Sequence, residues 1–261
     1  MSGTGPWERH FGPHGLTAAI LVLSTSPLAC GPPESARAPA DGASTGSQVD
    51  SPDPALPDST LLLAVDWYTG VAGSVDDEEA RSLLEESAAD GDPISIMWIA
   101  RVHSRGRMGF PQDTARARQL ATGVVDAIER SARARVPEAM FLMGTAFDEG
   151  LGRSVDPEEA VEWYRRAAEA GHILAAHNLG NALSAGRGVP EDPAGAVRWW
   201  RAAAEAGDAI TQLRLGEAYE AGRGVPSDLD SARVWYGRSA ATGNRQAREA
   251  LARLGAALER R

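Results

Sequence analysis

The strongest constraint on the fold of this chain is a phrase that recurs every 36 residues, from Gly150 to Gly186 to Gly222. Each copy contains a Gly-x-Gly pair, an Asp, an Ala, an aromatic pair and a closing Gly at the same offsets. Strict self-similarity with such a period is typical of a solenoid, in which each unit buries its apolar face only against its neighbours. The phrase therefore favours a binding array over a catalytic domain.

The composition excludes several classes of function. The chain has 261 residues, of which 43% are hydrophobic and 24% charged, so much of it can pack into a core. Its formal net charge of −10 argues against binding nucleic acid, because neutralising phosphates requires a basic surface. All 26 basic side chains are Arg, so mechanisms that need a catalytic Lys are excluded.

The first segment has the features of a secretory signal followed by a lipid-attachment site. An apolar run over residues 16–29 ends in small side chains just before Cys30, and it is too short to cross a bilayer stably. The surrounding Ser-Pro-Leu-Ala-Cys-Gly resembles a bacterial lipobox, in which the cysteine is lipidated and becomes the mature N-terminus. We therefore expect a signal peptide at 1–29 and lipidation of Cys30. A cleaved signal without lipid and an uncleaved chain are the alternatives.

Residues 30–58 are rich in Pro, Ala, Gly, Ser and Asp and contain few large apolar side chains. Such a stretch cannot bury enough surface to offset its ordering entropy, so it is predicted to be a disordered tether. Cys30 is the only cysteine, and one thiol cannot form an intramolecular disulfide.

Each copy of the phrase predicts two antiparallel helices. The first helix ends at the Gly-x-Gly pair, because Gly readily adopts the left-handed conformation that stops a helix. The following Asp is a predicted N-cap of the second helix. Asp156 with Glu159, and Asp76 with Glu79, match a capping box. The second helix then carries the Ala and the aromatic pair at helical spacing.

Two weaker copies precede the three strong ones, so the predicted fold is all-α: about five helix-turn-helix repeats and a C-terminal capping helix. The second repeat is eight residues longer than its siblings. An extension of its second helix by about two turns would keep the packing in phase. The predicted repeats are 59–94, 95–138, 139–174, 175–210 and 211–246, and the predicted cap is 247–258.

Two positions of the second helix are predicted to be structural. The small position lets two helix backbones approach closely, and the first aromatic position fills the space between successive repeats. Coincidence with the helical period favours a core role for these aromatic side chains over binding of a carbohydrate or cofactor. These positions are Ala160, Ala196 and Ala232, and Trp163, Trp199 and Trp235.

Together these residues resemble Sel1-like repeats, which are related to the tetratricopeptide repeat. The Ala-x-x-x-Leu-Gly opening, the Gly-x-Gly loop, the Asp cap and the Ala-x-x-Trp-Tyr-x-x-Ala-Ala helix carry the resemblance, over about 59–258. It implies a right-handed superhelix of antiparallel helix pairs that acts as an adaptor or scaffold. Some secreted members hold each hairpin with a disulfide, and this chain lacks those cysteines.

The resemblance also implies that the first helices line a concave face, with the positions beside each Leu-Gly pointing into a groove. The mixture of apolar and acidic side chains there would suit an extended peptide or protein loop with basic groups. Ordinary solvated positions are the alternative interpretation. The groove residues carried over by offset are Met97, Arg101, Phe141, Thr145, Asp148, His177, Asn181, Ser184, Leu213, Glu217 and Glu220.

No motif for catalysis, metal or cofactor binding stands out. His172 and His177 are poorly spaced as metal ligands on one helix, and neither a His-Glu-x-x-His motif nor a cysteine pair occurs. We therefore predict a non-catalytic binding scaffold in the bacterial cell envelope, with a protein or peptide partner. An envelope hydrolase or penicillin-interacting protein, and a cytoplasmic signalling adaptor, are the alternatives.

Overall fold

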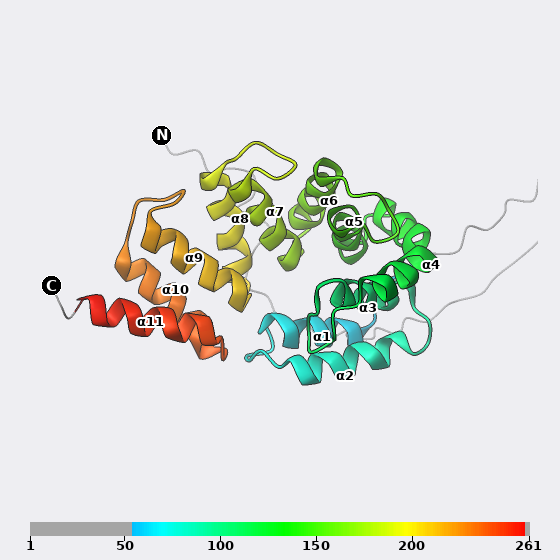
Figure 1. Cartoon of the computed structure of the whole chain (residues 1–261), viewed down its shortest axis with the longest axis horizontal. Helices are drawn as coiled ribbons and strands as arrows, with labels where there is room; N and C mark the ends of the chain where they lie inside the picture. The colour runs from blue at the N-terminus through cyan, green and yellow to red at the C-terminus, as the bar shows by residue number, and fades with distance from the viewer. Residues whose placement is uncertain (1–53, 259–261) are drawn as a thin grey trace, which may run out of the picture.

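A computed structural model describes residues 54–258, and the regular structure in this range is entirely α-helical (Figure 1). Five antiparallel helix pairs are followed by one more helix, which confirms the predicted all-α repeat fold. The predicted signal peptide 1–29, Cys30 and most of the tether 30–58 lie outside the described residues. The helices are α1 (Ser59–Thr69), α2 (Asp77–Ala88), α3 (Pro93–Arg105), α4 (Thr114–Arg133), α5 (Pro137–Glu149), α6 (Pro157–Glu169), α7 (Ile173–Ala185), α8 (Pro193–Glu205), α9 (Ala209–Ala221), α10 (Leu229–Ala241) and α11 (Arg245–Leu258).

The helix pairs stack in chain order along a curved path. The two helices of each repeat pack against each other, and each second helix packs on the first helix of the next repeat. First helices also touch across repeats, α3 on α5 and α5 on α7. Figure 1 shows α1 and α3 nearer the centre of the curve than their partners α2 and α4. The first helices therefore line the inner, concave side.

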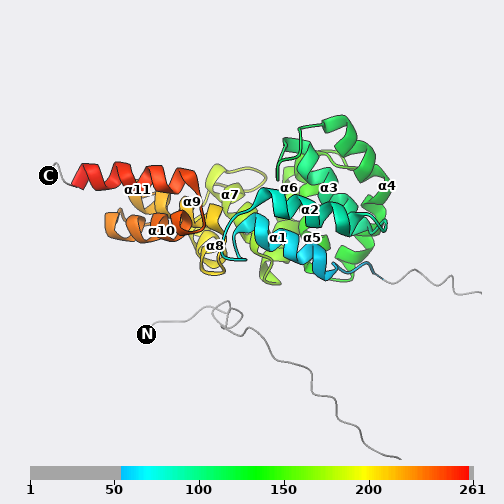
Figure 2. The ribbon, with the colours of Figure 1, turned by 90° about the horizontal axis from the view of Figure 1, so that it is seen from below.

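The curve is tight enough for the first and fifth repeats to touch. The backbone N–H of Val75, in the loop after α1, donates to the carbonyl oxygen of Thr242 over 3.0 Å. A Cβ on Gly70 in the same loop would lie 3.3 Å from the Cβ of Ala209 at the start of α9. Figure 2 shows the loop end of the α1–α2 pair reaching the other half of the array. This contact closes the curve.

A close approach between a glycine and an aromatic ring holds each of the three C-terminal hairpins. The glycine belongs to the first helix, and the ring belongs to the second member of the aromatic pair on the second helix. A Cβ on any of these glycines would lie 2.4–2.5 Å from the nearest ring atom, so no larger residue fits without moving the helices. The pairs are Gly144 with Tyr164, Gly180 with Trp200, and Gly216 with Tyr236.

The first member of the aromatic pair is buried in only two of the three repeats. Trp163 and Trp235 are 7% and 9% exposed, as predicted, whereas Trp199 packs against the core but is only half-buried, so its core role is confirmed in part. The guanidinium of an Arg three residues later lies 4.9 Å from the Trp163 ring and 4.4 Å from the Trp235 ring. The equivalent residue for Trp199 is Ala202, which is too short to cover the ring.

The second glycine of the Gly-x-Gly pair forms the seam between repeats. Gly188 has a φ of +67°, and a Cβ on it would lie 2.1 Å from the carbonyl oxygen of Pro157 in the preceding repeat. Gly224 has a φ of +76° and approaches the carbonyl oxygen of Pro193 in the same way. Glycine is therefore required twice over, by backbone conformation and by lack of space.

Each second helix begins at an Asp whose side chain accepts a hydrogen bond from a backbone N–H of the first turn, as predicted. In a full capping box the Glu three residues later also accepts a hydrogen bond from the backbone N–H of the Asp. Among the described residues this second bond is not made at Asp76 or Asp156. The Asp backbone N–H is already engaged, because it donates to a carbonyl near the end of the preceding helix. Across the five repeats these acceptors are Trp67, His103, Phe147, Leu183 and Tyr219.

The second repeat contains the predicted extension. Helix α4 has 20 residues, against 13 in α6, α8 and α10. Arg153 of the next repeat binds the C-terminal half of α4, with its Nη2 atom 2.8 Å from Asp126 Oδ1 and 2.6 Å from Glu129 Oε2.

Neither α4 nor any other described helix is apolar enough over its length to span a membrane.

A buried polar chain links the second, third and fourth repeats. Trp98 on α3 donates from Nε1 to Glu138 Oε1 over 2.6 Å, and Glu138 Oε2 lies 2.9 Å from Nε2 of His172, the N-cap of α7. Burial raises the pKa of Glu138, but the charge and hydrogen bond of His172 and the bond from Trp98 outweigh it. The resulting pKa lies below the usual range.

The glycine–ring approach predicts the effect of one methyl group. Gly180→Ala should lower the free energy of unfolding by about 1–3 kcal/mol, because the added Cβ would displace the Trp200 ring. Gly123→Ala is the control: no atom lies within 4 Å of that Cβ in α4, so it should stabilise by up to about 1 kcal/mol. Urea unfolding followed by circular dichroism measures both, and equal stability of the two variants would contradict the packing.

The close contact between Gly188 and the preceding repeat predicts a difference in stability between two glycine variants. Gly188→Ala should destabilise by about 2 kcal/mol more than Gly109→Ala, because only Gly188 has a backbone carbonyl in its way. Both glycines have a φ of +67°, and nothing lies within 4 Å of a Cβ on Gly109, so the conformational cost is matched. Thermal unfolding of the two variants checks this. Indistinguishable midpoints would show that the loop can move away from α6.

Candidate functional site

The inner side of the third to fifth repeats carries two adjoining hollows, which together we call the inner groove. The first, about 250 Å³, lies between α5, α6 and α7, and the second, about 290 Å³, lies between α7, α8 and α9. Asn181 lines both hollows. Tyr164 and Trp200 occupy the same position one repeat apart, as do Arg187 and Arg223. The inner groove is therefore one site repeated.

The carboxylates of the first hollow are bonded to arginines. Glu149 Oε1 lies 2.7 Å from Arg107 Nη2 and 3.3 Å from Arg105 Nε, and Asp148 Oδ1 lies 2.8 Å from Arg187 Nη2. Burial raises the pKa of Glu149, but the charge and hydrogen bond of Arg107 outweigh it and hold the pKa below the usual value. At Asp148 burial outweighs the nearby arginines, so the pKa lies above the usual value.

The second hollow has a similar pairing. Arg214 Nη1 lies 2.9 Å from Glu217 Oε2, and both side chains are about half exposed. Arg223 donates from Nη2 to the backbone carbonyl oxygen of Ser184 over 2.5 Å. Arg187 makes the equivalent bond to the carbonyl of Asp148 over 3.0 Å in the first hollow. The arginine between the two loop glycines thus ties its repeat to the first helix of the preceding one.

The structure brings four of the predicted groove residues together. Asp148, Asn181, Ser184 and Glu217 line the inner groove. Glu220, one helical turn beyond Glu217, accepts hydrogen bonds outside the two hollows from Tyr236 and Arg253, over 2.6 and 2.9 Å. All three predicted acidic side chains are therefore bonded to arginine. Within the described residues these three carboxylates are paired, and they give no support to a partner with basic groups.

Five other predicted groove residues lie in the interior. Met97 and Phe141 are 0% exposed and Leu213 is 4% exposed, because each packs into a hydrophobic cluster between neighbouring helices. Arg101 and Thr145 are buried beside them. The expectation that these side chains face an open groove is wrong, since the neighbouring repeat covers them.

His177 belongs to a buried hydrogen-bonded cluster. Its Nδ1 atom lies 2.7 Å from Thr211 Oγ1, which donates to Asp208, and its Nε2 atom lies 2.9 Å from Asn181 Nδ2. Burial lowers the pKa of His177, and this effect outweighs the negative charge of Asp208, which would raise it. In a catalytic relay the imidazole lies between the nucleophile and the acid, whereas here the hydroxyl lies between the acid and the imidazole. Thr211 is also 0% exposed, so no substrate atom can reach its hydroxyl.

Within residues 54–258 no group of three His, Cys, Asp or Glu side chains is placed to hold a metal ion.

Arg101 carries a buried positive charge next to the first hollow. Its guanidinium lies 4.6 Å from the Trp98 ring, 5.1 Å from Phe141 and 5.8 Å from Tyr68. Its Nε and Nη1 atoms have no hydrogen-bond partner among the described residues. Burial lowers the pKa of Arg101, and the positive charge of Arg107 adds to this.

The arginines of the inner groove are functional candidates that the sequence reasoning missed. Arg187 and Arg223 stand between the two glycines of the Gly-x-Gly pair, 36 residues apart, and that identity was a usable signal. Arg107 likewise follows the first loop glycine, Gly106. Arg105 and Arg214 have no such signature, because their place in the groove depends on how the neighbouring repeats are stacked.

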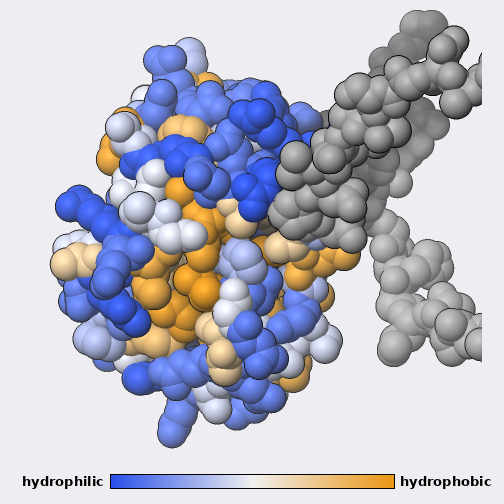
Figure 3. Space-filling view, turned by 90° about the vertical axis from the view of Figure 1, so that its right-hand side faces the viewer, coloured by the Kyte–Doolittle hydropathy of each residue, from blue (hydrophilic) through white to orange (hydrophobic). Residues whose placement is uncertain are grey.

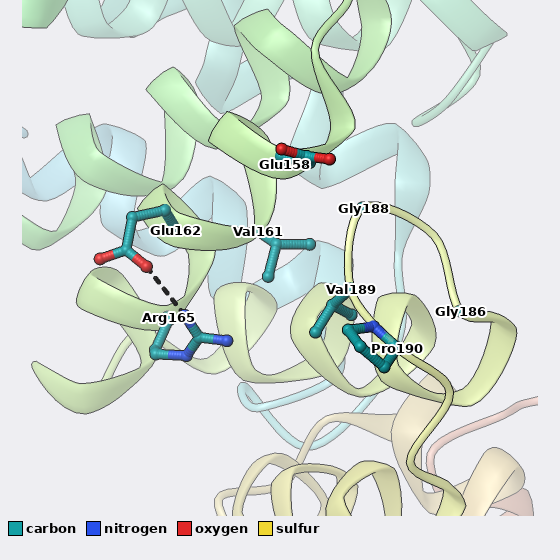
Figure 4. Close-up of a pocket in the computed structure, with 8 residues that line it drawn as sticks. All are labelled: Glu158, Val161, Glu162, Arg165, Gly186, Gly188, Val189 and Pro190. Atoms are coloured by element: carbon teal, nitrogen blue, oxygen red, sulfur yellow. Dashed lines mark hydrogen bonds and ion pairs between the residues drawn. The ribbon is translucent and has the colours of Figure 1, made fainter.

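A larger hollow of about 690 Å³ lies beside the groove, between α6 and the α7–α8 loop (Figure 4). Val161 and Val189 face each other across it, and Glu162 pairs with Arg165 over 2.8 Å. This hollow follows the seam where Gly188 meets the start of α6. Its shape is thus a consequence of repeat packing. Of its charged side chains Glu158 is exposed, and Glu162 and Arg165 are half-buried.

Apolar side chains also reach the surface. Figure 3 shows a patch of them, bordered by polar residues, on the side of the molecule where α4 lies in Figure 1. On α1, Leu62 and Leu63 are 45% and 44% exposed. The first repeat of a solenoid has no preceding neighbour to cover its outer side, which accounts for such exposure.

The model of the Sel1 repeat matches five segments of the chain: residues 57–92, 93–122, 137–172, 173–208 and 209–244. Each segment begins two residues before the corresponding predicted boundary. The second match ends at residue 122, inside α4. No curated protein matches the chain.

Several solved structures are similar to this chain. A Sel1 repeat protein from Oxalobacter formigenes is 30% identical, with a TM-score of 0.48, and the match covers 77% of this chain and 78% of that one. The protein c5321, a protective antigen of uropathogenic Escherichia coli with an SLR fold, is 27% identical, with a TM-score of 0.49. That match covers 74% of this chain but 47% of c5321, so this chain spans about half its length. Because the five repeat matches cover most of its length, the chain belongs to the Sel1 repeat family.

Proposed function

We propose that this protein is a non-catalytic scaffold that binds an extended segment of another protein in the inner groove. Sel1 repeat proteins are typically protein-interaction scaffolds. The observation that carries the proposal is the repetition of one hollow on two successive repeats, joined at Asn181. A polypeptide fits such a site because its repeating backbone offers similar groups to each repeat.

The junction of the two hollows is rigid, which favours binding. Asn181 Oδ1 accepts a hydrogen bond from Trp200 Nε1 over 3.2 Å, and Asn181 Nδ2 lies 2.9 Å from His177 Nε2. Trp200 is itself held against Gly180. A lining whose side chains are already fixed loses little conformational entropy when a ligand arrives.

The same proposal places the protein in the bacterial cell envelope, anchored by lipid at Cys30. It is supported by the apolar run at residues 16–29 and by the small residues that flank the cysteine. No observation favours the hydrolase alternative, since the hydroxyl of Thr211 beside His177 is inaccessible. A cytoplasmic adaptor would use the same groove and differs only in the fate of the N-terminus.

Binding in the inner groove predicts position-specific crosslinking. A photo-crosslinking amino acid at Glu217, a half-exposed residue of the second hollow, should capture one defined protein in native cells. The same amino acid at Arg198, which is exposed on α8 and lines neither hollow, should not capture it. Mass spectrometry of the crosslinked products identifies the partner. The same products from both positions, or none from Glu217, would count against the groove.

Anchoring at Cys30 predicts a defined mature product. Intact-mass analysis of the protein from native cells should show a chain that begins at a lipidated Cys30 and fractionates with membranes. Cys30→Ser should release the protein from the membrane fraction, because one thiol carries the whole attachment. An unmodified full-length mass in the wild-type protein would refute the anchor.

A further inference from the structure

We infer that the inner groove recognises a protein segment through its carboxylate groups, which bind to Arg187, Arg214 and Arg223. This inference rests on the proposed function and names the chemistry of the partner. The inferred partner is acidic, whereas the acidic residues of the predicted groove alone indicate a partner with basic groups. The reason lies in which side chains the fold brings to the groove.

The charge of the inner groove is opposite to that of the chain. The whole sequence has 36 acidic and 26 basic residues, a formal net charge of −10. Among the residues lining the two hollows, five arginines face three carboxylates. They are Arg105, Arg107, Arg187, Arg214 and Arg223 against Asp148, Glu149 and Glu217. A fourth carboxylate, Glu191, pairs with Arg223 over 3.3 Å from outside the hollows, which leaves a local excess of one positive charge. Low-dielectric walls concentrate the field of such an excess inside a hollow.

The three named arginines have donors to spare. A guanidinium carries five N–H groups. Within the described residues Arg187 and Arg223 bond through Nη2 alone, and Arg214 bonds through Nη1 alone. The side chains are 46%, 55% and 50% exposed, so the other nitrogen atoms are open to a ligand. A carboxylate can accept two parallel N–H bonds from such a group.

Buried charge behind the groove strengthens this preference. Arg107, which lines the first hollow, donates from Nη1 to the carbonyl oxygen of Arg101 over 2.9 Å. Arg101 is 5% exposed and has no carboxylate within ion-pair distance in the described part of the chain. Its positive charge is therefore offset only by distant groups and by ring faces.

The repeat spacing suits acidic residues at alternate positions. Arg187 and Arg223 stand at the same place in successive repeats, 36 residues apart. Side chains on one side of an extended chain recur about every 7 Å. A segment with an acidic residue at every second position can therefore present a carboxylate to Arg187 and another to Arg223, with its backbone beside Asn181.

The test uses the full chain and labelled peptides of equal length, measured by fluorescence anisotropy. The sequences alternate Ser with Glu, Gln or Lys and have amidated ends, and a second Gln peptide has a free carboxyl terminus. The Glu peptide should bind at least about tenfold more tightly than the amidated Gln peptide, and rising salt should weaken it. If the Gln peptide with a free carboxyl terminus binds more tightly than the amidated Gln peptide, the carboxylate that the groove recognises is that of a chain terminus.

Two charge reversals locate the binding site. Arg214→Glu should weaken binding of the Glu peptide by about tenfold or more, because a carboxylate that repels the peptide replaces a hydrogen-bond donor in the second hollow. Arg198→Glu on α8 makes the same change of net charge outside both hollows and should leave the affinity within about twofold. Circular dichroism confirms that both variants are folded. Glu217→Gln, which removes the competing carboxylate, should bind at least as tightly as the wild type.

Three results would overturn the inference: preference for the Lys peptide, no binding of any carboxylate-bearing peptide above the amidated Gln peptide, or equal effects of Arg214→Glu and Arg198→Glu. Each of these leaves the proposed function standing if Glu217 still crosslinks one partner in cells. If that crosslink also fails, the groove itself is the wrong site.

Discussion

The contact on which the rest of the structure depends is the packing of an aromatic ring against a helical glycine inside each strong hairpin. Tyr164 and Trp200 take the place that a Cβ would occupy on Gly144 and Gly180, and this brings the two helices of a repeat together. The same rings line the two hollows of the inner groove. One interaction therefore sets the helix spacing and also forms part of the candidate binding surface.

The loop between the helices combines structural and binding roles in a similar way. Gly188 is required at the seam because the carbonyl of Pro157 leaves no room for a side chain. The neighbouring Arg187 extends to the preceding repeat and enters the groove. A repeat that is displaced at its seam would thus also displace an arginine of the groove, so stability and recognition depend on the same few residues.

Charge in this protein is distributed unevenly, and the distribution matters more than the total. The acidic residues of the groove are bonded to arginines, and the arginines outnumber them there although the chain as a whole is acidic. Because the hollows lie on the concave side, their local field differs from that of the outer surface. An acidic partner would be repelled by most of the molecule and attracted by the groove, which favours specific docking.

The sequence by itself determined the repeats, the Asp caps, the loop glycines and the longer α4, because each depends on residues close together in the chain. It was wrong about Met97 and Phe141 and right only in part about Trp199, because the exposure of these side chains depends on what the adjoining repeat places over them. Only the tertiary structure decided which side chains share the groove and that its carboxylates are already paired. Those facts depend on stacking between repeats, where contacts join residues far apart in sequence and no local pattern records them.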